Sequence, residues 1–197
     1  MDERDLDPDP LRQFQRWFME ARDAGIELPE SMALATSTVD GRPSVRMVLL
    51  KDAAESGFAF YTNYESRKGA ELDANPHAAL LFHWQPLGRQ VRVEGRVERV
   101  PADESEAYFV TRPLGSRLAA WASPQSRPLA GRDELERLYE EAVARFPADE
   151  VPRPPHWGGF RLLPEAFEFW QHAENRLHDR IRYERDGATW KRERLGP

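Results

Sequence analysis

The sequence predicts a mainly β protein, an antiparallel barrel with helices at its periphery. β-rich runs follow one another directly and are joined by tight turns, at Asp40-Gly41 and again at Asp186-Gly187. Helical patterns do not alternate with the strands, as they would in a doubly wound parallel sheet. No repeat or Gly/Ser-rich linker divides the 197 residues. We therefore expect one domain over residues 1–197, with residues 1–8 as a flexible amino-terminal arm.

The first half of the chain is expected to contain two helices and several strands. Asp9 followed by Pro10 marks a helix start, because an acceptor at the N-cap and a proline in the first turn both favour one. An apolar stripe continues this helix to Gly25. Ser66 is a second N-cap, for a helix that runs to about residue 75. The strands are expected at 32–39, 43–51, 57–62, 78–84 and 90–100.

The second half is expected to begin with helices and to end with strands. Short helices are predicted over 103–112 and 116–122, and a surface helix with one apolar side over 133–146. A proline-rich loop follows over 147–155. The closing strands are expected at 158–163, 166–171, 178–185 and 189–195.

The composition excludes several classes of protein. The chain has no cysteine, so disulfides, thiolate metal sites and cysteine nucleophiles are ruled out, and a reducing, cytoplasmic location is expected. No apolar run approaches the roughly 20 residues of a membrane span, and the acidic first residues are no signal peptide. The five histidines lack metal-ligand spacing, and neither a dinucleotide nor a P-loop glycine motif occurs. We expect no metal and no contact with membranes.

Cationic side chains gather with hydroxyl groups at four places, although the net charge of the chain is −6. These places are 46–51, 61–68, Tyr108 with Arg112 and Ser116, and 176–180. Arginine, lysine and hydroxyl groups together are typical of phosphate sites. Because a nucleic-acid surface usually shows a broad basic stripe, local clusters on an acidic chain favour small phosphorylated ligands and no nucleic acid.

The most informative cluster lies near the carboxyl end. If residues 176–180 form a strand, Arg176, His178 and Arg180 share one face, while Leu177 and Asp179 face the other way. Two guanidinium groups with an imidazole between them make a good anion site, and the imidazole can hold or pass a proton near neutral pH. The alternative is a solvated strand face that carries only ion pairs.

The same residues belong to a longer pattern. The run Phe167-Glu168-Phe169-Trp170-Gln171, four residues, then Arg176-Leu177-His178-Asp179-Arg180 resembles the signature of the pyridoxamine 5′-phosphate oxidases. The segments 46–51, 61–62, 66–68, 89–91, 125–126 and 157–160 resemble that family too, in its order. The resemblance covers the chain from about residue 9 to residue 197. It implies an FMN-binding split β-barrel that forms a homodimer, with each active site shared across the interface.

The resemblance also assigns roles to residues. The cofactor residues that it implies are Arg46, Met47, Val48, Leu49, Lys51, Tyr61, Thr62, Arg67, Lys68 and Gln90, with Gln125, Ser126, Trp170 and Arg180 from the other subunit. The implied clamp on the substrate phosphate is Lys51, Tyr108, Arg112 and Ser116. Arg176 and His178 are implied to lie over the pyridine ring as the catalytic pair.

The implied reaction is the oxidation of pyridoxamine or pyridoxine 5′-phosphate to pyridoxal 5′-phosphate, with O2 as the electron acceptor and H2O2 as a product. Two alternatives stay open. An oxidase of the same fold could act on another substrate of the phenazine type, since a fold alone does not fix a substrate. A non-catalytic protein could bind FMN or pyridoxal phosphate, but it would have no use for Arg176 together with His178.

Overall fold

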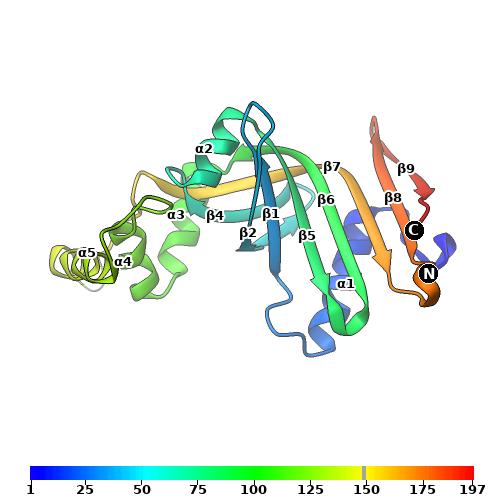
Figure 1. Cartoon of the computed structure of the whole chain (residues 1–197), viewed down its shortest axis with the longest axis horizontal. Helices are drawn as coiled ribbons and strands as arrows, with labels where there is room; N and C mark the ends of the chain where they lie inside the picture. Colours follow the sequence, from blue (N-terminus) through cyan, green and yellow to red (C-terminus); the bar gives the residue numbers. More distant parts are fainter. Residues whose placement is uncertain (148–149) are drawn as a thin grey trace.

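A computed structural model describes residues 1–147 and 150–197 of the chain. This part contains one nine-stranded sheet that curls into a half-barrel (Figure 1). The strand order is β2-β1-β5-β6-β7-β4-β3, and β8 and β9 continue from β7. The strands are β1 (Ser31–Ser37), β2 (Pro43–Leu49), β3 (Asp52–Ala54), β4 (Gly57–Asn63), β5 (His77–Trp84), β6 (Arg89–Arg99), β7 (Trp157–Gln171), β8 (Asp179–Asp186) and β9 (Thr189–Arg194).

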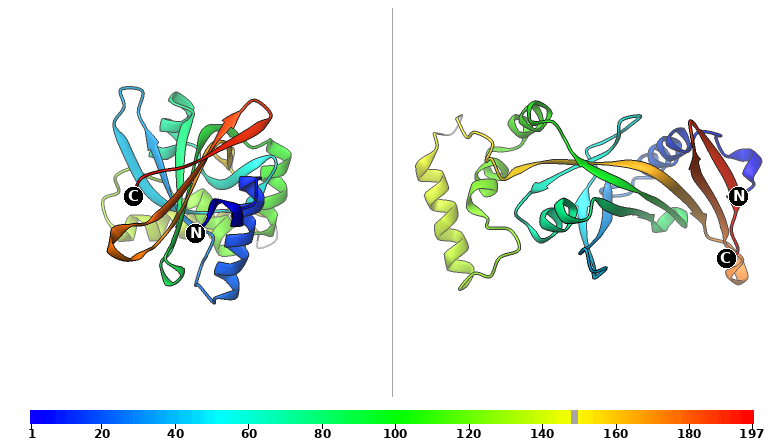
Figure 2. Two further views of the ribbon diagram at one scale, coloured as in Figure 1. Left: turned by 90° about the vertical axis from the view of Figure 1, so that its right-hand side faces the viewer. Right: turned by 90° about the horizontal axis from the view of Figure 1, so that it is seen from above.

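Helices lie around this sheet, and every strand pairing is antiparallel, which confirms the predicted fold class. Figure 2 shows α4 and α5 at one end of the molecule and the β8–β9 hairpin at the other. Asp9 and Ser66 cap α1 and α2 with their side chains, as the sequence predicts. The helices are η1 (Glu3–Asp5), α1 (Pro10–Asp23), α2 (Arg67–Ala74), η2 (Gln85–Leu87), α3 (Ala102–Thr111), α4 (Leu114–Ala122), α5 (Arg132–Arg145) and η3 (Glu174–Arg176).

The main core lies between α1 and the concave side of the sheet. The Phe14 ring of α1 packs against the rings of Phe58 and Phe82, each with centroids 4.9 Å apart, and Trp17 packs edge-on against Phe169 at 5.3 Å. All five side chains are almost completely buried. Burying a large apolar side chain contributes roughly 1.5–3 kcal/mol, so this contact holds the helix on the sheet. A smaller apolar cluster joins α4 to α5.

Strand β7 is one element where the sequence predicts two. Strands were expected over 158–163 and 166–171, with a break at Pro164, but β7 runs from Trp157 to Gln171. Pro164 lies opposite Gly95 of β6, where the strand register shifts. Proline has no N–H for the regular hydrogen-bond ladder, and this irregular position does not require one. Strand β3 was not predicted, because its three residues carry no alternating pattern. The predicted loop over 147–155 includes residues 148–149, which lie outside the described residues.

The first residues contact the C-terminal hairpin. The Met1 amino group pairs with Asp179 at 2.6 Å, and Arg194 pairs with Glu3 at 2.6 Å. Leu6 is buried in the main core. These contacts fix the position of the arm in the structure, and its flexibility stays a prediction. No helix among residues 1–147 and 150–197 is long and apolar enough to cross a membrane.

Candidate functional site

A buried lysine defines the first part of the site. Ser66 starts α2, and the second residue of the helix, Lys68, turns inward so that 9% of it is exposed. Its ammonium donates to the Thr62 hydroxyl at 3.1 Å, to the Ser66 hydroxyl at 3.3 Å and to Oε1 of Gln125 at 2.7 Å. All three acceptors are neutral, and among the described residues no carboxylate forms an ion pair with Lys68. Burial, together with repulsion from Arg46, lowers the pKa of Lys68 to about 8.

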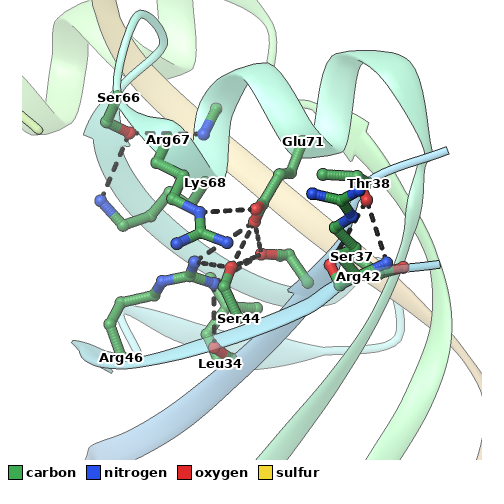
Figure 3. A network of polar contacts seen from close by, with 12 residues as sticks. Leu34, Ser37, Thr38, Arg42, Ser44, Arg46, Ser66, Arg67, Lys68 and Glu71 are labelled. Atoms are coloured by element: carbon green, nitrogen blue, oxygen red, sulfur yellow. Dashed lines mark hydrogen bonds and ion pairs between the residues drawn. The ribbon is translucent and has the colours of Figure 1, made fainter. Parts of the chain in front are cut away.

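A buried cation without a counter-ion is costly unless an anion joins it. The neighbouring groups favour a phosphate as that anion. The first N–H groups of α2 lie beside Lys68, and a helix start attracts negative charge. Arg67 precedes Lys68 and is largely exposed, and Arg46 reaches the same region from β2 (Figure 3). We call Arg46, Thr62, Arg67 and Lys68 the first anion cluster.

A second anion cluster consists of Arg112, Tyr108, Tyr61 and Trp157. The guanidinium of Arg112 lies 4.5 Å from the centre of the Trp157 ring, and the Tyr61 and Tyr108 rings stack at 4.1 Å. Nη1 of Arg112 is buried and has no hydrogen-bond partner in the described part of the chain. Burial lowers the pKa of Arg112. Arg112 is therefore a half-buried cation that has no anion beside it in the described part of the chain, 44 positions along the chain from Lys68.

Two glycines allow the second cluster to form. A Cβ on Gly159 would lie 2.7 Å from the side chain of Val100 and 2.9 Å from the ring of Tyr61, and one on Gly158 would lie 2.0 Å from the hydroxyl of Tyr64. Real side chains do not approach so closely, so bare backbone is required where these rings lie against β7. Tyr61 and Thr62 are adjacent in β4; Thr62 belongs to the first anion cluster and Tyr61 to the second.

The carboxyl-terminal group differs from its prediction. Strand β8 begins at Asp179, whereas Asn175 and Arg176 have φ values of 55° and 62°. The expectation that Arg176, His178 and Arg180 share one strand face is therefore wrong, because alternation holds only in extended backbone. The chain turns at Arg176, and Leu177 is 69% exposed rather than packed on the opposite face.

His178 and Arg180 have partners of their own. The His178 ring lies 4.6 Å from the Trp170 ring, and its Nδ1 accepts from the backbone N–H of Ala173 at 3.2 Å. Arg180 pairs with the buried Glu168 through two contacts of 2.8 and 3.1 Å. Arg180 is thus engaged by a carboxylate in the single chain, while the imidazole of His178 keeps Nε2 for another partner.

The carboxyl-terminal group and the anion clusters lie at opposite ends of β7. Trp157 supports the second cluster at one end, and Trp170 lies near the other. At about 3.3 Å per residue the two tryptophans are roughly 40 Å apart along the strand. Figure 1 likewise shows β8 apart from α2 and α3. One chain therefore does not bring Arg176 and His178 to Lys68 and Arg112.

The remaining predicted residues are spread over the edges of the sheet. Gln90 on β6 is the cross-strand neighbour of Trp170. Gln125 contacts Lys68 of its own chain, whereas we expected it to reach the site from the other subunit. Met47, Leu49 and Lys51 are exposed at the edge strand β2 and just after it, while Val48 is partly buried; Ser116 is half-buried on α4, and Ser126 is exposed with a φ of 70°.

Three residues of the site were not predicted: Glu71, Trp157 as a support for Arg112, and Glu168. Glu71 stands four positions after Arg67 on α2, the spacing at which opposite charges meet on a helix. That spacing was the available signal. Nothing local indicated that this carboxylate is buried, because its other partners lie on β1 and β2.

A curled antiparallel half-barrel carries two separate cations, the buried Lys68 and the half-buried Arg112, and neither pairs with an anion among the described residues. This arrangement is typical of a protein that binds phosphorylated small ligands. Comparison with known families makes this class specific. Residues 18–145 match the family model described as pyridoxamine 5′-phosphate oxidase, and residues 157–197 match the pyridoxine 5′-phosphate oxidase C-terminal dimerisation region. The chain belongs to the pyridoxamine 5′-phosphate oxidase family. It is a flavin-dependent oxidoreductase, and its cofactor is FMN.

Individual relatives agree with this family. The pyridoxine/pyridoxamine 5′-phosphate oxidase of Rubrobacter xylanophilus is 60% identical over 191 residues, which is 97% of this chain and 88% of the relative. That of Cupriavidus necator is 58% identical over 198 residues, which is 100% and 93% of the two chains.

Solved structures agree with the fold. The crystal structure of PhzG from Burkholderia lata, in complex with tetrahydrophenazine-1-carboxylic acid, is 35% identical, with a TM-score of 0.92 over 98% of this chain and 95% of that one. A pyridoxamine 5′-phosphate oxidase-related, FMN-binding protein from Nostoc punctiforme has a TM-score of 0.76 over 98% and 100% of the two chains; at 18% identity it shows the fold alone. The match of residues 157–197 to a dimerisation region supports a homodimer.

Proposed function

We propose that this enzyme oxidises pyridoxamine 5′-phosphate and pyridoxine 5′-phosphate to pyridoxal 5′-phosphate, with O2 as the acceptor. The observation that carries the proposal is a pair of cations, the buried Lys68 and the half-buried Arg112, that have no counter-ion in the described part of the chain. The reaction needs two phosphate sites in one enzyme, one for the cofactor and one for the substrate. The curated relatives at 58–60% identity, which are named for this activity, support the choice of substrate.

The first anion cluster fits the phosphate of FMN. Lys68 supplies a desolvated ammonium, Arg67 a largely exposed guanidinium, and the start of α2 its free N–H groups. Gln125 now accepts from the ammonium and would share it with the phosphate. FMN held here would supply the redox chemistry, the removal of two electrons from the substrate and their delivery to O2 to give H2O2.

The second anion cluster fits the phosphate of the substrate. Nη1 of Arg112 is buried and has no acceptor among the described residues, and stacking on Trp157 holds the guanidinium in place. The hydroxyl groups of Tyr108 and Ser116 lie on the adjacent helices α3 and α4. Binding the substrate by its phosphate leaves the pyridine ring free to be positioned by other residues, and such positioning accounts for much of an enzyme's rate.

A second copy of the chain is proposed to complete the site. Arg176 and His178 are about 40 Å along β7 from the residues that would hold the phosphates, so they serve the site of a neighbouring chain. The dimerisation region that includes β7 to β9 supports this arrangement. Nε2 of His178 can hydrogen-bond the substrate or take a proton from its amine or alcohol, because only Nδ1 is engaged. Water then hydrolyses the imine that pyridoxamine phosphate yields, and ammonia leaves.

The phenazine type of activity is the second candidate, supported by the 35% identity to PhzG. The test supplies the FMN-loaded protein with pyridoxamine phosphate, pyridoxine phosphate or a reduced phenazine carboxylic acid. Oxygen uptake and peroxide release are measured together with pyridoxal phosphate formation. We expect one H2O2 and one pyridoxal phosphate per O2 with both vitamers. Oxidation of the phenazine compound alone would refute the proposal, and a flavin-loaded protein inert toward all three would indicate a binding protein.

A further inference from the structure

A buried carboxylate lies in the middle of the first anion cluster, where a phosphate site would not be expected to hold one. Glu71 of α2 is 5% exposed. It accepts from the hydroxyls of Thr36 and Ser44 at 2.5 Å each, from Nε of Arg67 at 2.9 Å and from Nη2 of Arg46 at 3.3 Å (Figure 3). Burial by itself would raise the pKa of Glu71, but the donors Ser44, Thr36 and Arg67 outweigh it and lower the pKa to about 2. The carboxylate is therefore charged at neutral pH.

The contacts of Arg46 show what this carboxylate does to one arginine. Nη1 of Arg46 donates to the Leu34 carbonyl at 3.1 Å and to the Thr36 hydroxyl at 2.6 Å, and Nη2 donates to Ser44 at 2.5 Å and to Glu71. Arginine has five N–H donors, so Nε alone is left. Arg46 therefore joins β1, β2 and α2 to one another, with four of its five donors engaged within the chain.

The contacts of Arg67 are the opposite. Glu71 accepts only from its Nε, one helical turn away, and among residues 1–147 and 150–197 neither terminal nitrogen has a partner, on a side chain that is 60% exposed. These two nitrogens form the planar fork that binds a phosphate through two parallel hydrogen bonds. Arg67 and Lys68 are the first two residues of α2, so the fork and the buried ammonium belong to the same helix start.

We infer that Glu71 is a positioning residue for the cofactor phosphate. It holds the guanidinium of Arg46 against β1 and β2, and through Nε of Arg67 it orients the two terminal nitrogens of Arg67 toward the phosphate. This inference rests on the proposed use of the cluster for FMN. The charges agree with it. Three cations with one carboxylate leave an excess of about two positive charges, which matches a phosphate that carries about −2 near neutral pH. Without the carboxylate, the two guanidinium groups would repel each other.

The test compares FMN with riboflavin, which lacks the phosphate, on flavin-free protein. Glu71→Gln keeps the shape of the side chain but weakens its hold on both arginines. We expect its Kd for FMN to rise about tenfold, the effect of weakening one charge-assisted hydrogen bond, and its Kd for riboflavin to stay unchanged. Asp73→Asn is the matched control, because Asp73 lies on the same helix and pairs with Arg99, outside the cluster. It should change neither value.

Arg67→Lys supplies an independent measurement, since the exposed Arg67 can be replaced without loss of folding. Lysine keeps the charge but lacks the fork. We expect a similar loss of FMN affinity, and little further loss when Glu71→Gln is added to Arg67→Lys, because both changes remove the same aimed fork. A merely structural Glu71 would change both flavins alike.

The outcomes separate the inference from the proposed function. If Glu71→Gln binds FMN as tightly as the parent or more tightly, the positioning role is wrong, although the parent still prefers FMN to riboflavin. If Arg67→Lys has no effect on FMN, the aimed fork is wrong. If the parent itself binds FMN and riboflavin equally, the cluster is no phosphate site, and the cofactor assignment fails together with the role of Glu71.

Discussion

The depressed pKa of Lys68 predicts that FMN binding depends on pH above neutrality. In the flavin-free protein, burial and Arg46 lower the pKa of this ammonium to about 8. A phosphate placed against Lys68 favours the charged form and raises that pKa again. Binding therefore takes up a proton above pH 8, and the affinity for FMN must fall as the pH rises. Below about pH 6 the phosphate gains a proton and binding weakens for a separate reason.

The expected size follows from the one proton involved. Between pH 6.5 and 8 the affinity should be nearly constant. Above pH 8 each pH unit weakens binding by up to about tenfold, or about 1.4 kcal/mol, until the pKa of the complex is reached. A lysine with its ordinary pKa of 10.5 would show no change before about pH 10. The slope of the FMN affinity against pH between pH 8 and 9.5 therefore reports the protonation of Lys68.

Stability of the flavin-free protein should change in the opposite direction. Because the pKa of Lys68 is lower in the folded state, the unfolded chain binds more protons between about pH 8 and 10.5. The contribution of this group to the free energy of unfolding therefore rises with pH in that window. The burial cost of the charged ammonium is present below pH 8 and fades above it. Bound FMN should remove most of this dependence.

The assay is quenching of flavin fluorescence by flavin-free protein, measured from pH 6.5 to 9.5. Riboflavin serves as the ligand without phosphate, and Lys68→Met as the variant of similar length without charge. We expect a falling affinity for FMN with the parent, a flat profile for riboflavin, and a weak, flat profile for FMN with Lys68→Met. A parent profile that stays flat to pH 9.5, or a Lys68→Met profile with the parent's slope, would refute the reasoning.

Three further predictions concern the substrate and the partner chain. Arg112→Ala should raise KM for pyridoxamine phosphate by about 10- to 150-fold in steady-state kinetics, because a charged hydrogen-bond partner is lost, while FMN stays bound. Arg145→Ala, which removes a cation over Trp121 outside the clusters, is the control. Arg176→Ala should keep the yellow colour and lower kcat/KM strongly, with partial rescue by Arg176→Lys; parent-like kinetics would remove Arg176 from the site. FMN should shift dilute protein toward the dimer in sedimentation, since ligands stabilise the form that binds them; a monomer with full FMN affinity would contradict the shared site.

Much of the fold could be predicted because its signals are local. The caps at Asp9 and Ser66, the turn at Asp40-Gly41 and the alternating strands each depend on a few neighbouring residues. That β7 is one continuous strand could not be predicted from the sequence, because Pro164 breaks the local strand pattern. Only the pairing with Gly95 on β6 accommodates the proline. Long-range pairing decides that strand.

The site was predictable as a set of residues and less so as a geometry. Lys68 and Thr62 were both expected at the cofactor, and the structure brings them together; Gln125, expected from the other subunit, contacts Lys68 of its own chain. The start of β8 was misjudged because alternation was assumed where Arg176 adopts a left-handed conformation. The role of Glu71 could not be predicted for another reason. A glutamate four positions after an arginine on a helix is typical of an ordinary ion pair on the surface.

The two glycines at the start of β7 make the substrate clamp sensitive to substitutions in the strand backbone behind it. Gly159 is not among the residues proposed to bind a ligand, yet an added methyl group would push against Val100 and Tyr61, and through Tyr61 against Tyr108. Substitutions there would first be felt as altered substrate affinity in a protein that still folds around its main core. A survey of natural or random variants that scores only side chains near the ligands would miss this position. We expect Gly159→Ala to mimic a mutation of the substrate clamp, although it adds only a methyl group to a strand backbone.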